Sequence, residues 1–141
     1  MKKRNLSVCN WALLLAMPLA VLGGVLLENL HGEAFCGLAN PVWVWVHVAL
    51  AAGTVLLALW HLNLNWKGVA NWVRLFGHHR SWAFKLLFIF FFATLLTGLC
   101  ALPFWLTHGH FGLGGVHGKL GIAFAWFAVV HIVQRTKWFQ S

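Results

Sequence analysis

Four long apolar runs constrain the fold of this chain more than any other feature of its sequence. They cover roughly residues 6–30, 41–64, 82–106 and 116–134. Each is long enough to cross the hydrocarbon core of a bilayer, about 30 Å thick, as an α-helix. The 141 residues are 61% hydrophobic and only 9% charged, which is too little polar surface for a soluble domain. The sequence therefore predicts one all-α domain over residues 1–141, an integral membrane four-helix bundle.

The first apolar run follows the basic sequence Met1-Lys2-Lys3-Arg4 and so has features of a secretory signal peptide. The run extends to Leu30, however, and is longer than the apolar core of a typical signal. Phe35 also stands directly before Cys36, where a lipoprotein signal would need a small residue. We therefore interpret the run as the first transmembrane helix.

The basic residues indicate the orientation of these helices. Eight of the ten lie at the N-terminus, between the second and third runs, or after the fourth, and a ninth, Lys85, lies just inside the start of the third run; Lys119 alone lies near the opposite side. The segments 31–40 and 107–115 contain no Lys or Arg. Because cytoplasmic loops are enriched in basic residues, we expect both termini to be cytoplasmic (N-in/C-in) in a bacterial inner membrane. The net charge of +8 does not indicate nucleic-acid binding, since the basic residues form no patch.

The segment between the second and third runs contains a shorter pattern. Val69, Trp72, Val73 and Phe76 recur at helical spacing. A short amphipathic helix over about 67–77, lying on the inner membrane surface, would explain this pattern. An ordinary connecting loop with aromatic anchors is the alternative.

Two histidine pairs stand within the apolar runs. His47 and His61 are 14 residues apart, His117 and His131 repeat that spacing, and the pairs are offset by 70 positions. Fourteen residues of α-helix turn through about 1400°, some 40° short of four turns, and rise about 21 Å. Both imidazoles of a pair therefore project from nearly the same face. With the second and fourth helices running from outside to inside, His47 is level with His117 and His61 with His131.

A single histidine in such a helix is equally well explained by packing against a neighbouring helix. Four in register favour a function, because ionisable side chains are costly in a bilayer. Neutral imidazole binds iron through one ring nitrogen and can donate a hydrogen bond to a backbone carbonyl from the other. The pattern is what two stacked haems with two axial histidines each would require.

Small residues provide a second indication. A porphyrin between helices needs small residues where it passes the backbone, although small residues also permit close helix packing. Around the inner histidines these residues are Ala58 and Ala128, and Gly53 lies near the middle of its run. The outer half contains Gly23, Gly24, Gly98, Gly118 and Gly121.

The region 41–138 resembles the core of dihaem membrane cytochromes b, that is, the four-helix haem bundle of respiratory cytochrome b and, more loosely, cytochrome b561-like proteins. The chain departs from respiratory cytochrome b in having four helices and no Pro-Glu-Trp-Tyr sequence. It also has no C-x-x-C-H motif for covalent haem and no nicotinamide or flavin fingerprint.

The resemblance implies two non-covalent, bis-histidine haem b groups. It implies His47 and His117 as the iron ligands of the outer haem, and His61 and His131 as those of the inner haem. We expect further cofactor contacts from small residues and one cation, with Lys119 at a haem propionate. These are Gly53, Gly98, Gly121 and Lys119.

The expected function is electron transfer across the membrane, as a subunit of a quinone-linked oxidoreductase or as its partner. Besides lipid, such a protein needs a redox partner protein or sister subunit, and a quinone is a candidate donor or acceptor. A metal or proton transporter using the histidines is the alternative, but it predicts acidic residues inside the helices, and only Glu28 comes close. A thiol-oxidising quinone enzyme is a further alternative, but it needs a pair of exported cysteines, and Cys36 has no obvious exported cysteine partner.

The remaining histidines have two interpretations. Three of them could join Glu33 in an outer metal or quinone site, or simply be solvated, namely His31, His108 and His110. His78 and His79 could flank an inner quinone pocket, with the same alternative. The cysteines are interpreted as small apolar residues.

Overall fold

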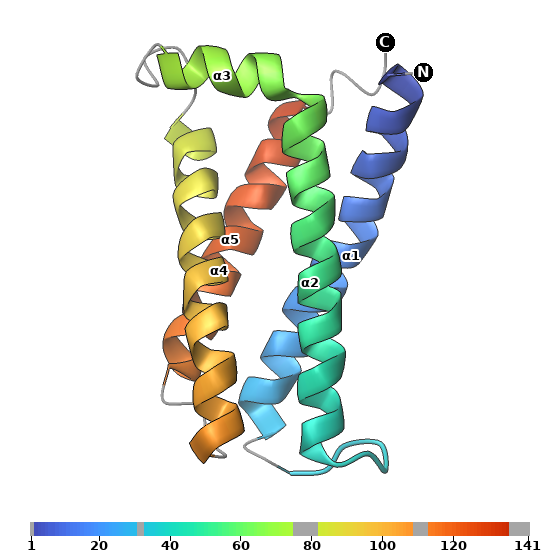
Figure 1. Ribbon diagram of the computed structural model, residues 1–141. Helices are drawn as coiled ribbons and strands as arrows, with labels where there is room; N and C mark the ends of the chain where they lie inside the picture. Colours follow the sequence, from blue (N-terminus) through green and yellow to red (C-terminus); the bar gives the residue numbers. More distant parts are fainter. Residues whose placement is uncertain (1, 31–32, 75–81, 109–112, 136–141) are drawn as a thin grey trace. The chain divides into compact units, whose positions relative to one another are not determined.

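The computed structural model describes residues 2–30, 33–74, 82–108 and 113–135. The α-helices of this part of the chain are α1 (Lys2–Leu30), α2 (Asn40–Leu64), α3 (Trp66–Arg74), α4 (Trp82–His108) and α5 (Gly114–Arg135) (Figure 1). The chain divides into two units, residues 1–79 and 80–141. In the first unit α1 packs against α2, and in the second α4 packs against α5. We call these pairs the first hairpin and the second hairpin and describe each by itself.

The two hairpins consist of the four apolar helices predicted from the sequence. Each of these helices contains a span of 22 to 27 residues that is long and apolar enough to cross a membrane. At a rise of 1.5 Å per residue, even the shortest span is about 33 Å long, which exceeds the hydrocarbon core. The helices extend up to four residues beyond the predicted limits, because polar residues at their ends continue the helix past the apolar run.

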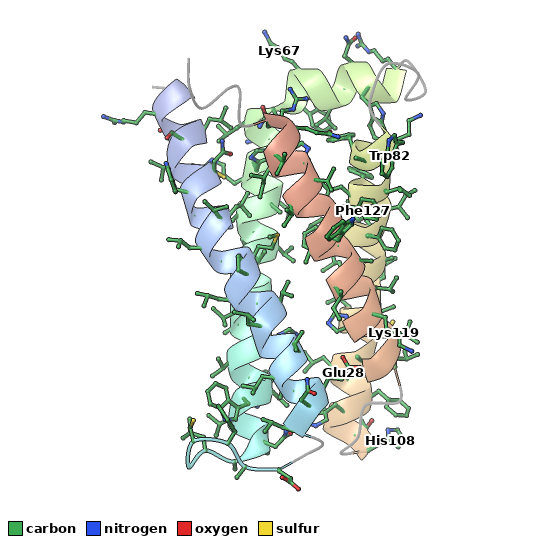
Figure 2. The ribbon with its side chains drawn as sticks, turned by 180° about the vertical axis from the view of Figure 1, so that it is seen from behind. Glu28, Lys67, Trp82, His108, Lys119 and Phe127 are labelled. Carbon is green, nitrogen blue, oxygen red and sulfur yellow. The ribbon has the colours of Figure 1, made fainter. Side chains whose placement is uncertain are left out.

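Helix α3 begins one residue before the region 67–77, where a short amphipathic helix was expected. It ends at Arg74, and residues 75–77 lie outside the described part of the chain. Val69 is buried whereas Lys67 and Asn71 are exposed, so α3 has one covered face and one polar face. Figure 2 shows the Lys67 side chain projecting away from the helix, and Figure 1 shows α3 running across the end of α2.

A tight turn precedes α2. The backbone N–H groups of Phe35 and Leu38 each donate to the carbonyl oxygen of the other residue, at 3.0 Å. The two residues between them, Cys36 and Gly37, have φ angles of 50° and 75°, as two-residue turns of type I′ require. Trp43 Nε1 donates to the Phe35 carbonyl at 3.1 Å, which ties the turn to the first turns of α2.

The first hairpin packs through small and medium side chains. Cys9 is completely buried, and its Sγ lies 3.4 Å from the Leu57 carbonyl oxygen of α2. Ala20 is also buried on α1, and Val44 on α2. Small residues let two helices approach closely, which is the usual packing mode within a bilayer. Backbone atoms of α1 are therefore within reach of polar side chains on α2.

The second hairpin packs largely through aromatic rings. Phe90 of α4 stacks on Phe127 of α5 with ring centroids 5.2 Å apart and an interplanar angle of 12°. Trp82 meets the same Phe127 edge-on at 6.1 Å, and Figure 2 shows these two side chains from α4 and α5. Phe91 and Phe124 form another pair at 5.7 Å. Paired rings of this kind contribute roughly 0.5–1.5 kcal/mol each beyond the area they bury.

Candidate functional site

His47 lies in a notch on the neighbouring helix of the first hairpin. Its Nδ1 is 3.0 Å from the backbone carbonyl oxygen of Ala20 on α1. A Cβ atom on Gly24 would lie only 3.1 Å from His47 Cε1, and one on Gly23 would lie 3.4 Å from Nδ1. The imidazole thus occupies space that side chains would fill at two consecutive residues. We call this arrangement of His47, Ala20, Gly23 and Gly24 the first clamp.

His117 has the same surroundings in the second hairpin. Its Nδ1 is 3.1 Å from the backbone carbonyl oxygen of Thr94 on α4, and the hydroxyl oxygen of Thr97 is 3.3 Å away. A Cβ on Gly98 would lie 2.9 Å from His117 Cε1, closer than real Cβ contacts allow. We call this arrangement of His117, Thr94, Thr97 and Gly98 the second clamp.

The two clamps assign the same tautomer to His47 and His117. A carbonyl oxygen can only accept a hydrogen bond, so Nδ1 carries the proton in each ring and Nε2 carries the lone pair of the neutral imidazole. The Thr97 hydroxyl is consistent with this assignment, because it donates to carbonyl oxygens of its own helix, including that of Ala93 at 2.8 Å. Its oxygen is thus a second acceptor near His117 Nδ1.

His61 is held by side chains instead of a carbonyl. Its Nδ1 is 2.9 Å from Asn10 Oδ1 on α1. At the end of α2, Asn65 Nδ2 donates to the His61 carbonyl oxygen at 2.9 Å and lies 3.5 Å from His61 Nε2. The shorter distance identifies the carbonyl as the main acceptor of the Asn65 amide.

His131, the remaining histidine of the two pairs, lies beside an aromatic ring. The centroids of His131 and Phe84 are 6.0 Å apart, with the planes inclined by 47°. Phe84 belongs to α4, as Asn10 belongs to α1. His61 and His131 are therefore each packed against the first helix of their own hairpin, but through different chemistry.

The hairpins share one internal spacing. On the second helices the histidines are 14 residues apart, at 47 and 61 and at 117 and 131. On the first helices the residues that face them are also 14 apart, at 24 and 10 and at 98 and 84. Because the helices of a hairpin are antiparallel, the equal spacing keeps both contacts in register. The two hairpins are thus structural repeats with respect to their histidines.

Three other residues expected to contact the cofactor belong to neither clamp, namely Gly53, Gly121 and Lys119. A Cβ on Gly53 would meet no described atom within 4 Å, and one on Gly121 would meet only Thr94 Cγ2, at 3.8 Å. Lys119 is exposed, and Figure 2 shows it projecting from α5. Of the glycines expected near the outer histidines, Gly23, Gly24 and Gly98 lie against a histidine ring.

Of the five histidines outside the two pairs, His108 lies in the described part of the chain. It forms contacts within its own helix, where Nδ1 lies 3.2 Å from the Phe104 carbonyl oxygen and the two rings stack at 4.4 Å. His31, His78, His79 and His110 lie outside the described residues. Among residues 2–30, 33–74, 82–108 and 113–135, no three His, Cys, Asp or Glu side chains form a metal-binding group.

Sequence reasoning missed the hydrogen-bond acceptors on the first helices that hold the histidines. Asn10 is the clearest omission, since no other amide or charged side chain occurs between Leu6 and Leu27. A lone amide in a membrane helix usually hydrogen-bonds to a neighbouring helix, and that signal was available. The carbonyl groups of Ala20 and Thr94 gave no such signal, because every residue has one.

The chain was also compared with known proteins. It matches no protein-family model, no curated protein and no solved structure.

Proposed function

We propose that this protein is an integral membrane b-type dihaem cytochrome that passes electrons across the membrane. The observation that carries the proposal is the repeated clamp. In each hairpin a histidine donates from Nδ1 to a backbone carbonyl at 3.0–3.1 Å, above a glycine that leaves room for the ring. Haem-ligating histidines need this arrangement, because a fixed Nδ1–H orients the ring and directs the Nε2 lone pair at the metal.

The donor set fits haem better than it fits a structural metal. Neutral imidazoles are suitable axial ligands, and two per iron give a low-spin b-type centre. We assign His47 and His117 to the outer haem, and His61 and His131 to the inner haem. Bound haem iron would supply one-electron chemistry by alternating between its ferric and ferrous states. This assignment requires the two hairpins to associate, each contributing one histidine at each level.

The chain's own residues have defined tasks in this proposal. Ala20 and Thr94 hold the outer imidazoles through their carbonyl groups, and Gly24 and Gly98 give the rings access to the backbone. The apolar helices exclude water from the ligand positions. Lys119 is proposed to neutralise a haem propionate from the outer side. Gly53 and Gly121 are proposed to leave room for porphyrin edges.

The membrane setting completes the proposal. The distribution of basic residues supports an N-in/C-in orientation of a four-helix bundle in a bacterial inner membrane. Helical geometry places the two ligands of a hairpin about 21 Å apart along the axis. Electrons would then enter and leave at opposite surfaces, with a quinone at one and a redox protein or sister subunit at the other.

Haem analysis of the purified protein tests the proposal. We expect about two haems per chain, with b-type bands in the reduced-minus-oxidised spectrum. His61→Ala or His131→Ala should remove one haem and leave the outer one. His108→Ala is the control, because this exposed histidine is not one of the four proposed ligands, and it should retain both haems.

Two results would overturn the proposal. One is absence of haem from protein expressed with adequate haem supply. The other is a His61→Ala protein that retains two low-spin haems, which would disprove the ligand assignment. Metal or proton uptake by the haem-free protein in vesicles would then favour the transporter alternative.

A further inference from the structure

The packing of the first hairpin does not explain why residue 10, within a membrane helix, is an asparagine. Asn10 lies within the membrane span of α1, and its Oδ1 is 2.9 Å from His61 Nδ1. An amide carries two donors and an acceptor, so placing it in a bilayer is costly unless it has partners. The neighbouring Cys9 shows that a small apolar residue packs fully in this region of the helix.

The second hairpin provides an internal comparison. Phe84 stands 14 residues before Gly98, as Asn10 stands 14 residues before Gly24, and each contacts the inner histidine of its hairpin. An aromatic residue at this position is therefore compatible with a hairpin of the same design. The amide of Asn10 is not required by the packing of such a hairpin, which points to a chemical role at His61.

The kind of acceptor matters for this role. His47 and His117 donate to backbone carbonyls, which no side-chain substitution removes. His61 donates to a side-chain oxygen, so its acceptor depends on the identity of residue 10. An acceptor on Nδ1–H raises the electron donation of an imidazole to a metal, and ligand basicity is one of the protein's means of setting a haem potential.

We propose that Asn10 is a positioning residue that orients His61 as an iron ligand and lowers the reduction potential of the inner haem. This inference rests on the proposed dihaem function. Asn10 fixes the Nδ1–H tautomer of His61 and so directs its Nε2 lone pair to iron. Asn65 keeps its shorter hydrogen bond to the His61 carbonyl oxygen when Nε2 binds the metal.

A redox titration of the purified protein, followed in the visible bands, tests the proposal. Asn10→Leu keeps the number and branching of the side-chain heavy atoms and removes the acceptor. We expect two haems per chain, one potential unchanged and the other raised, with a reduction equilibrium constant about tenfold larger, or about 59 mV for a one-electron couple. Asn10→Asp retains an oxygen acceptor in either protonation state, so its potential should equal the wild-type value or lie below it.

Phe90→Leu is the control, because it changes the size of a membrane-helix side chain that stacks on Phe127 and removes no oxygen. It should shift neither equilibrium constant by more than about twofold, which corresponds to roughly 18 mV on the same scale. If Asn10→Leu does not assemble, Asn10→Ala serves in its place, since alanine favours the helix and also lacks an acceptor. Loss of the inner haem in Asn10→Ala, with both haems retained in Asn10→Asp, would also support a positioning role.

The outcomes separate the two proposals. Wild-type protein without haem contradicts the proposed function. Wild-type protein with two haems, combined with an Asn10→Leu or Asn10→Ala protein of unchanged potentials, contradicts the role of Asn10 and leaves the function standing. Equal shifts in Asn10→Leu and Asn10→Asp would also overturn the inference, because they would reflect packing alone.

Discussion

Replacing Gly98 with alanine tests whether the second clamp holds His117 in a required position. The new Cβ would lie 2.9 Å from His117 Cε1 and 3.3 Å from Nδ1. Carbon atoms pack comfortably from about 3.5 Å, so the ring must move by about 0.5 Å. The bond from Nδ1 to the Thr94 carbonyl oxygen is already 3.1 Å long. A displacement away from α4 lengthens it toward about 3.6 Å, beyond hydrogen-bonding range.

The expected cost follows from three contributions. Alanine is favoured over glycine inside a helix by about 0.5–1 kcal/mol. Overpacking opposes this gain by about 1–3 kcal/mol, and a lost hydrogen bond adds about 0.5–1.5 kcal/mol. We therefore expect Gly98→Ala to destabilise the protein by about 1–3 kcal/mol and to weaken haem retention. Gly115→Ala is the matched control, because its Cβ meets no described atom within 4 Å and only the helix gain remains.

Thermal unfolding in detergent, with haem content measured on the same samples, tests the expected loss of stability and of haem in Gly98→Ala. The transition temperature should fall for Gly98→Ala, fall less for Gly24→Ala, where the Cβ would lie 3.1 Å from His47 Cε1, and stay equal or rise for Gly115→Ala. A Gly98→Ala protein as stable and as haem-replete as Gly115→Ala would refute the reasoning, since it would mean that His117 does not need the space above Gly98.

Two further predictions concern the hairpins themselves. Phe127→Ala removes the ring that stacks on Phe90 and meets Trp82 edge-on. It should lower the free energy of unfolding by roughly 3–5 kcal/mol if the cavity does not collapse, and so lower the transition temperature, whereas Phe127→Leu should recover part of this loss. An unchanged transition temperature in Phe127→Ala would contradict the aromatic packing. In intact cells a membrane-impermeant maleimide should label Cys36, which is exposed at the tip of its turn, but not the buried Cys9; labelling of Cys36 only after the cells are opened would reverse the proposed orientation.

The helices of this protein were predictable because their signal is local. An apolar run of sufficient length is a membrane-helix candidate whatever its neighbours are, and α2 was placed within one residue at its start and ended as expected at Leu64. The amphipathic spacing around Val69 likewise indicated α3. Helical geometry alone was also enough to predict, from the 14-residue spacing, that both histidines of a pair lie on nearly the same face of their helix.

The partners of the histidines were not predictable in the same way. Gly98 and Gly53 are equivalent as residues, but one contacts a histidine and the other does not. The difference depends on how each helix is rotated and how far it slides along its neighbour, and no local pattern encodes either quantity. The contact between Asn10 and His61 also joins residues 51 positions apart. Only the fold of the hairpin brings them together.

The confinement of each clamp to one hairpin has a consequence for assembly. The described groups that hold His47 include the Ala20 carbonyl and two glycines of α1, and those that hold His117 include the Thr94 carbonyl and Gly98 of α4. Each hairpin can therefore orient its own histidine before it meets the other hairpin. Under the proposed function, haem would then be the template that selects the alignment of two hairpins whose ligands are already oriented.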